Sequence, residues 1–115
     1  MDQLHIGTAD VGKMVQEDAV AGLEDALICE WQGLKRTFPV ASGGLQPGMI
    51  PKLIERMGTD IIAQFGGGCH GHPKGTKAGA KAIRQAVQAA LAGIDLKKYS
   101  KNKEELKLAL KKWGE

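Results

Sequence analysis

Residues 37–73 read TFPVASGGLQPGMIPKLIERMGTDIIAQFGGGCHGHP, and this stretch decides the fold class. Two apolar runs each end in glycines, the first at Ser42-Gly43-Gly44 and the second at Gly66-Gly67-Gly68, with a helix-like segment between them. This order predicts two parallel strands that open into glycine loops at the same edge of a sheet. Because glycine lets the backbone approach a ligand closely, the N–H groups of such loops suit an anion such as phosphate.

The rest of the chain extends the same alternation of strands and helices. We predict strands at Gln3–Gly7, Thr37–Ala41 and Ile61–Phe65, and helices at Glu17–Glu30, Pro47–Met57, Thr76–Leu91 and after Asn102, which caps the last helix with Glu105 three residues on. Pro39 argues mildly against the second strand, since proline donates no ladder hydrogen bond. The inward faces of the last two helices are predicted to be Ala82, Ile83, Ala86, Val87, Ala90 and Leu91, and Leu106, Ala109, Leu110 and Trp113.

Three βα units predict an α/β fold with a parallel sheet. Three parallel strands cannot close a barrel, and a whole TIM (β/α)₈ barrel needs about 250 residues, whereas this chain has 115. The chain therefore looks like the last three-eighths of such a barrel at residues 1–94, followed by a C-terminal helical extension at residues 95–115. In these barrels the last two strand–loop units often form a phosphate site.

The composition argues against a membrane protein, a secreted protein and a nucleic-acid-binding protein. The chain is 43% hydrophobic and 25% charged, which is typical of a soluble globular protein. We expect no secretory signal and no membrane span, and hence a cytoplasmic protein with reduced thiols at Cys29 and Cys69. The net charge of +3 comes largely from tail lysines. Because Glu104, Glu105 and leucines alternate with those lysines at helical spacing, a solvated helix face is favoured over nucleic-acid binding.

The N-terminal part adds two candidate residues. Lys13 lies near the end of the glycine-flanked loop at residues 8–13, where it can close over a site and place positive charge where negative charge develops. His5, at the first strand, adds a hydrogen-bond donor. The residues alone also allow a structural histidine and an ordinary surface lysine. Residues 69–72, CHGH, lack the spaced ligand pairs of a typical zinc site, and we predict no metal there.

Three segments together resemble a known family. LHIGTADVGKM, TFPVASGGLQPGMIP and QFGGGCHGHPKGTKAGAKAIRQAV resemble the C-terminal part of the large chain of ribulose-1,5-bisphosphate carboxylase/oxygenase (RuBisCO), most like the archaeal-type form III enzymes. The resemblance runs from Asp2 to Trp113, with the motifs in the family's order. It implies strands six, seven and eight of the catalytic barrel with their helices, and the C-terminal helical extension.

The resemblance also implies site residues. Lys13 corresponds to the mobile loop lysine that reaches the new carboxylate, and His5 to the histidine that contacts the phosphate on carbon five of the substrate. Ser42 corresponds to the serine beside the substrate's hydroxyls. The backbone cradle for the phosphate on carbon one corresponds to Gly43, Gly44, Gln64, Phe65, Gly66 and Gly67.

The family's reaction adds CO₂ to ribulose 1,5-bisphosphate and yields two 3-phosphoglycerates. It implies Mg²⁺, whose activating lysine and acidic ligands have no counterpart in this sequence. We therefore expect this chain to be one part of a carboxylase, to depend on the rest of the large chain in a dimer-based homo-oligomer, and to be inactive alone.

Two other functions stay open at this point. One is a RuBisCO-like enolase or isomerase acting on another phosphorylated substrate, and the other is a phosphate-binding or assembly module without enzymatic activity. We also expect the open sheet edges to favour self-association, with Ile6, Phe38, Val40, Ile62 and Phe65 partly available to solvent or to another chain.

Overall fold

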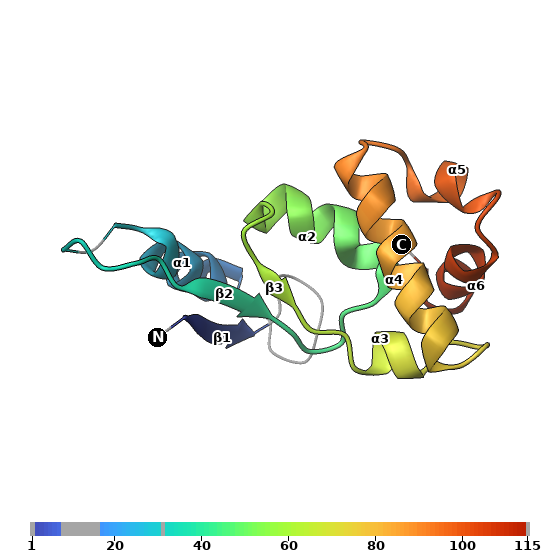
Figure 1. Cartoon of the computed structure of the whole chain (residues 1–115), viewed down its shortest axis with the longest axis horizontal. Helices are drawn as coiled ribbons and strands as arrows, with labels where there is room; N and C mark the ends of the chain where they lie inside the picture. The colour runs from blue at the N-terminus through green and yellow to red at the C-terminus, as the bar shows by residue number, and fades with distance from the viewer. Residues whose placement is uncertain (1, 8–16, 31, 115) are drawn as a thin grey trace.

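The computed structural model of the chain describes residues 2–7, 17–30 and 32–114 (Figure 1). Its strands are β1 (Gln3–Gly7), β2 (Phe38–Ala41) and β3 (Ile62–Ala63). Its helices are α1 (Glu17–Ile28), the 3₁₀ turn η1 (Pro47–Met49), α2 (Ile50–Met57), α3 (Gly67–His70), α4 (Thr76–Leu91), α5 (Leu96–Ser100) and α6 (Glu104–Trp113). The predicted α/β alternation is therefore confirmed for the part of the chain that the structure describes.

The three strands form one parallel sheet in the order β1-β2-β3, which is the order that successive βα units produce. Pro39 lies in the central strand without breaking it. The Phe38 amide donates to the Asp2 carbonyl at 2.9 Å, so the next residue turns its backbone toward the β3 side. Because β3 begins at Ile62, opposite Val40, the nitrogen of Pro39 faces that side before any pairing starts.

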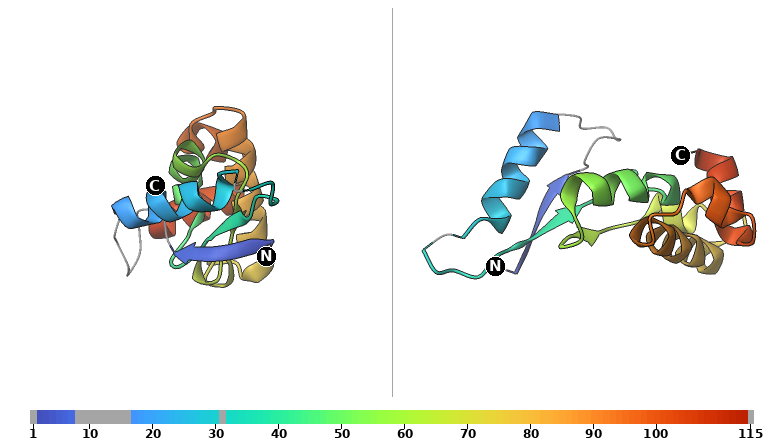
Figure 2. Two further views of the ribbon diagram at one scale, coloured as in Figure 1. Left: turned by 90° about the vertical axis from the view of Figure 1, so that its left-hand side faces the viewer. Right: turned by 90° about the horizontal axis from the view of Figure 1, so that it is seen from above.

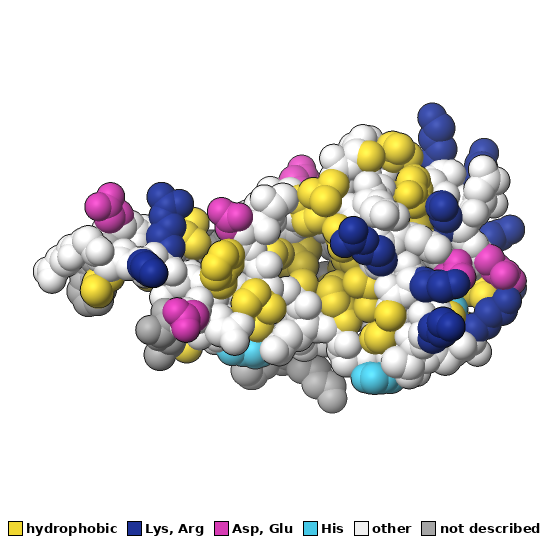
Figure 3. Space-filling view, in the orientation of Figure 1, with side chains coloured by type: hydrophobic (Ala, Val, Ile, Leu, Met, Phe, Trp, Pro, Cys, Tyr) yellow, Lys and Arg dark blue, Asp and Glu magenta, His cyan; other side chains and the backbone are white. Residues whose placement is uncertain are grey.

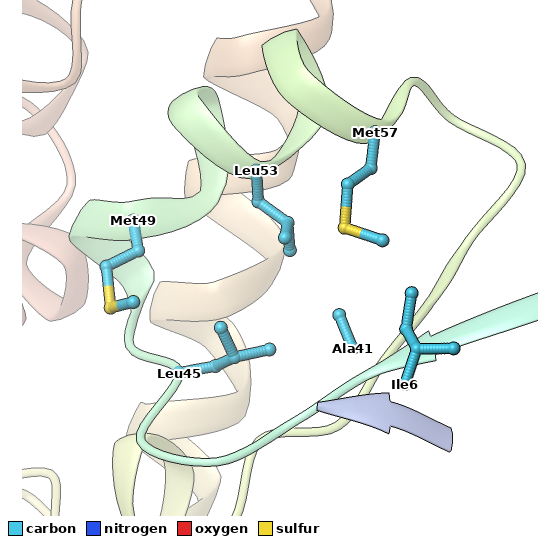
Figure 4. Packing of buried hydrophobic residues seen from close by; sticks show 6 residues of the cluster. All are labelled: Ile6, Ala41, Leu45, Met49, Leu53 and Met57. Atoms are coloured by element: carbon cyan, nitrogen blue, oxygen red, sulfur yellow. The ribbon is translucent and has the colours of Figure 1, made fainter. Parts of the chain in front are cut away.

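A first core joins the sheet to α2. The buried side chains of Leu53 and Met57 on α2 point toward Ala41 and Ile6 of the sheet, and Met49 on η1 lies beside Leu45 in the same cluster (Figure 4). The spacing of these apolar positions follows the helical period, and Pro51 lies in the first turn of α2, where a missing N–H costs little. The helix ends at Gly58, whose φ of 72° lies in the left-handed region that glycine adopts readily.

A second core joins α2 to the C-terminal helices. It consists of Ile50, Ala86, Ala89, Leu96 and Leu106. Small alanines on α4 let this helix pack closely against α6, and Figure 2 shows α4, α5 and α6 grouped at the end of the molecule opposite α1. The molecule is elongated, with extents of 48 × 28 × 23 Å.

The inward face of α4 differs from the prediction at one edge. Leu91 is 62% exposed, whereas Ala89, which was not predicted, is fully buried. The reason is that Ala86 and Ala89 pack in the second core with Leu96 of α5 and Leu106 of α6, and Leu91 lies outside that core at the end of the helix. On α6 the prediction is closer, since Leu106 and Ala109 are buried and Leu110 and Trp113 are half-buried.

Several predicted boundaries are also corrected. β3 spans two residues instead of Ile61–Phe65, because only Ile62 and Ala63 pair with β2, and beyond them Gln64 adds a single bond to the Ala41 carbonyl. The helix α5 was not predicted; Asp95 caps it by accepting a bond from the Lys98 amide at 3.0 Å.

Asn102 does not cap the last helix. The N-cap residue of α6 is Lys103, whose side chain makes no capping hydrogen bond. The predicted capping box with Glu105 is absent because the Glu105 carboxylate is held elsewhere, by Gln85 Nε2 at 2.9 Å and Lys81 Nζ at 3.2 Å. A tertiary contact thus replaces the local one.

The exposed apolar side chains of the sheet are fewer than expected. Phe38 is 49% exposed, and Ile62 and Phe65 are half-buried, but Ile6 and Val40 are buried. Ile6 points to the helix-covered face and packs in the first core, which corrects its predicted orientation. Self-association is tested by none of these observations and stays a prediction.

The charged residues follow the predicted surface pattern of the tail. Lys107, Lys111 and Lys112 of α6 are exposed, and Figure 3 shows Lys and Arg side chains gathered over the α4–α6 end of the molecule. Within the described residues, no helix combines the length and apolarity that crossing a membrane requires.

Truncation of the second core should be costly. Leu106 is fully buried, so we expect Leu106→Ala to lower the free energy of unfolding by about 2–5 kcal/mol through lost burial and a residual cavity. The matched control is Leu91→Ala, which removes the same atoms from an exposed site and should change it by about 0.5 kcal/mol or less. Urea unfolding followed by circular dichroism measures both. Equal losses would contradict the packing described above.

The Glu105 carboxylate makes stability depend on pH. The hydrogen bond from Gln85, then the Glu105 backbone amide and Lys81, lower the pKa of Glu105 from 4.5 to about 2. Its contribution is therefore complete above about pH 4.5 and is lost as the pH falls toward 2. We expect Glu105→Gln to flatten the fall in stability across this window, while Glu104→Gln, at a 69% exposed side chain, leaves the profile nearly unchanged. Melting temperatures measured from pH 6 to 2 would show this, and identical profiles would refute it.

Candidate functional site

The candidate site lies at the carboxyl ends of the parallel strands. His5 is exposed on β1, opposite Val40 of β2, and Ser42 is the residue that follows β2. A bulge between His5 and Gly7 shifts the end of β1 relative to β2. His5 Nε2 and Ser42 Oγ form a hydrogen bond, so two residues 37 positions apart in the sequence meet at this edge.

The loop after β2 needs glycine for its backbone. Gly43 and Gly44 have φ values of 93° and 74°, in the left-handed region that residues with a Cβ rarely adopt. Both glycines are exposed, and the next residue, Leu45, is 2% exposed and packs in the first core. The loop is therefore anchored at Leu45 and has both glycines at the surface, which is an arrangement that suits an anion.

The loop after β3 is built by backbone bonds. The Gln64 amide donates to the Ala41 carbonyl at 2.9 Å, which extends the sheet by one bond. The amides of Cys69 and His70 both donate to the Gly66 carbonyl at 3.0 Å and so turn the chain sharply. Gly66 and Gly67 remain exposed, while Phe65 turns its half-buried side chain toward both cores.

The two glycine loops touch each other at Gly68. A Cβ built on Gly68 would lie 2.2 Å from the Leu45 carbonyl oxygen and 2.9 Å from the Gln46 Cα. Since real Cβ atoms do not approach backbone this closely, the two loops can lie against each other only where residue 68 is glycine. Gly79 on α4 is constrained in a similar way. A Cβ at that residue would lie 2.0 Å from the Cys69 carbonyl oxygen, so α4 can pack against Cys69 only where residue 79 is glycine.

Sequence reasoning did not assign a role to Gly68 or Gly79. The signal for Gly79 was available, because a glycine inside a strong helical pattern usually has a packing reason. For Gly68 no local signal exists, since its partner is 23 positions away and the third glycine of a run looks like any turn residue.

The structure brings together most of the predicted site residues. His5 and Ser42 are bonded, and Gly43, Gly44, Gln64, Phe65, Gly66 and Gly67 lie on the two loops that meet at Gly68. Lys13 lies outside the described residues.

The side chains of residues 69–72 are engaged within the protein. Cys69 Sγ donates to the Thr76 carbonyl at 3.6 Å, and His70 Nδ1 is 3.1 Å from Thr76 Oγ1. Across residues 2–7, 17–30 and 32–114, no three His, Cys, Asp or Glu side chains are grouped so that they could hold a metal ion. The described residues therefore do not fit a magnesium site by themselves.

A cavity of about 260 Å³ lies away from this edge. It is lined in part by Arg36, Phe38 and Asp60, which precede or begin β2 and β3, so it is at the amino ends of the strands. Ligands of open α/β sheets bind outside the carboxyl ends. The loop edge, not this cavity, is therefore the candidate site.

Comparison with known proteins gives one consistent result. Residues 1–113 match the family described as ribulose bisphosphate carboxylase large chain, catalytic domain. The chain is 51% identical to a ribulose bisphosphate carboxylase of Pyrococcus furiosus, over 99% of this chain and 27% of that protein. The chain thus spans about a quarter of the length of the curated relative that it matches.

Two solved structures share the fold. An octameric ribulose-1,5-bisphosphate carboxylase/oxygenase from Pyrococcus horikoshii superposes with a TM-score of 0.92 at 47% identity, covering 98% of this chain and 27% of that one. A rubisco-like protein from Alicyclobacillus acidocaldarius superposes with a TM-score of 0.90 at 32% identity, covering 97% of this chain and 28% of that one. The fold alone therefore does not separate the two kinds of protein.

The contact between the loops can be tested with a single methyl group. We expect Gly68→Ala to lower the free energy of unfolding by about 1–3 kcal/mol, because the Leu45 backbone must move to admit the Cβ. Gly22→Ala adds the same methyl to α1, where nothing lies within 4 Å, and should be neutral or stabilising by up to about 1 kcal/mol. Urea unfolding of both variants decides the matter, and a neutral Gly68→Ala would mean that the loops are not in contact.

Proposed function

The chain belongs to the family of the ribulose bisphosphate carboxylase large chain, and on that premise we propose that it forms part of a ribulose-bisphosphate carboxylase and supplies its phosphate-binding loops. The observation that carries the proposal is the pair of glycine loops, which follow neighbouring parallel strands and touch at Gly68, with the bonded pair His5 and Ser42 beside them. The substrate is ribulose 1,5-bisphosphate, and CO₂ is added to it to give two 3-phosphoglycerates.

The loops act by backbone recognition. An aliphatic side chain offers no hydrogen-bond donor to a phosphate, whereas several backbone N–H groups can point at its oxygens where glycines let the backbone approach closely. Gly43, Gly44, Gly66 and Gly67 are all exposed, so both loops can contribute. The backbone of Gln64 and Phe65 connects β3 to the second loop, and the Gln64 amide bonds β2 at the Ala41 carbonyl.

His5 and Ser42 act on the other parts of the substrate. The imidazole of His5 donates to the second phosphate, and the Ser42 hydroxyl bonds the hydroxyls between the two phosphates. Their mutual bond orients both side chains before substrate arrives, which lowers the entropy lost on binding. Lys13 supplies a positive charge to the new carboxylate.

Three further features belong to the same proposal. The sheet and its helices form strands six to eight of a TIM (β/α)₈ barrel, with residues 1–94 in the barrel and 95–115 in a helical extension. The protein uses Mg²⁺, whose ligands come from outside the described residues. It assembles as a homo-oligomer, as the octameric relative does.

A rubisco-like enolase or isomerase is the second candidate. The rubisco-like neighbour has nearly the same fold, but its identity to this chain is 32%, against 51% for the carboxylase of Pyrococcus furiosus. Retention of Lys13, Ser42 and both glycine pairs also supports the carboxylase.

The test is a chimera in which this chain replaces the matching C-terminal part of the Pyrococcus furiosus relative. We expect it to convert ribulose bisphosphate and labelled CO₂ with Mg²⁺ present. Lys13→Ala should lower kcat by about 10²-fold or more and change the KM for ribulose bisphosphate less, because the lysine acts on charge that develops late in the reaction.

Three further outcomes test the proposal and distinguish a carboxylase from an enolase or isomerase. The 115-residue chain alone should show no turnover above a blank, and turnover there would contradict the assignment of the metal ligands to another region. An unchanged kcat in Lys13→Ala would remove Lys13 from the catalytic residues. A folded, oligomeric chimera that binds the bisphosphate without fixing CO₂ would favour the enolase or isomerase.

A further inference from the structure

The C-terminal helix contacts both glycine loops, although it is distant from them in the sequence. Near its end, the Trp113 carbonyl accepts a bond from Gln46 Nε2, at 3.4 Å, from the loop after β2. At the same end, Lys112 Nζ donates to the Gly71 carbonyl, in the segment after β3. The Trp113 ring also closes on that segment, because its Cζ2 atom lies 3.4 Å from where a Gly71 Cβ would be.

The first turn of α6 is tied to the second loop through His72. This histidine is 4% exposed, and its Nε2 lies 2.9 Å from the Glu105 carbonyl. The Lys74 amide donates to Nδ1 at 3.0 Å. Because an amide can only donate, Nδ1 is the acceptor, and the ring proton is on Nε2, where it donates to Glu105. Both ring nitrogens are thus used inside the protein.

We propose that α6 sets the spacing of the two phosphate loops, and that His72 is the positioning residue that transmits it. The contacts on α6 are at Glu105 in its first turn, which bonds His72, and at Lys112 and Trp113 in its last, which bond Gly71 and Gln46, so the helix holds the segment after β3 and the loop after β2 together. The His72 ring lies 6.5 Å from the Trp113 ring, between the loop and the helix. Loss of the Nε2 bond leaves the Glu105 carbonyl without this partner and frees the loop to move away from Leu45.

The functional consequence rests on the proposed phosphate site. Backbone recognition depends on the relative placement of the N–H groups on the two loops, and a shift of about 1 Å is enough to weaken it. His72 touches no substrate in this scheme. It acts through Gly68, whose contact with Leu45 requires the second loop to stay where α6 holds it.

The experiment uses four variants of the whole chain. His72→Ala removes both bonds, and His72→Gln restores an N–H donor at the Nε2 position. Leu96→Ala truncates a 3% exposed side chain in the second core, away from both loops. It is the control for a general loss of stability. Lys74→Ala removes the ion pair to Glu104, at 2.6 Å between exposed side chains, and keeps the backbone bond to His72.

The first readout does not involve phosphate. Nuclear Overhauser contacts between the α protons of Gly68 and Gln46 report whether the loops touch. We expect this contact in the wild-type chain, in His72→Gln, in Leu96→Ala and in Lys74→Ala, and its loss in His72→Ala. Retention of the contact in His72→Ala, or an equal loss in Leu96→Ala, would overturn the proposal.

The second readout is titration with inorganic phosphate, followed by the amide shifts of Gly43, Gly44, Gly66 and Gly67. We expect His72→Ala to weaken binding about tenfold or more, because loss of the buried hydrogen bond shifts the loops toward arrangements that do not bind phosphate. His72→Gln, Leu96→Ala and Lys74→Ala should stay within about threefold of wild type. Absence of binding by the wild-type chain would count against the phosphate site of the proposed function, while the first readout would still decide the role of His72.

Discussion

The contact on which the site depends is the approach of Gly68 to the Leu45 carbonyl, at a distance that admits no side chain. It places the backbone of one glycine loop against the other, although 23 positions separate these residues in the sequence. Two adjacent loops can offer N–H groups to one anion, whereas two separated loops cannot. Leu45 is 2% exposed and packs in the first core, which fixes the position of its backbone in this contact.

Helix α2 gives the loops a common support. Leu53 and Met57 pack on the sheet, and Ile50 packs on α4 and α6, so one eight-residue helix has a side in each core. The strands that end in the loops and the helices of the C-terminal end are therefore both packed against the same helix. Rigid elements below flexible glycine backbone are the arrangement in which binding loops can be both accessible and ordered.

The local sequence was a good guide to the sheet and a poor one to the C-terminal end. The strand sites, the glycine loops and the helices α2 and α4 follow from apolar periodicity and glycine position, which are local properties. The predicted cap at Asn102 and the inward position of Leu91 failed because Gln85, Lys81 and α5 provide contacts that no window of neighbouring residues contains. The α5 helix was missed because five residues with one Asp cap give little signal.

The sequence by itself determined the α/β alternation, the two glycine loops with His5 and Ser42 as site candidates, and the resemblance to a carboxylase family, because residue type and spacing carry these. Only the tertiary structure decided that His5 bonds Ser42, that Gly68 and Gly79 must lack a side chain, and that His72 joins the second loop to α6. These depend on distances between atoms far apart in the chain. Such distances arise from how the two cores pack, and no pattern of neighbouring residues encodes them.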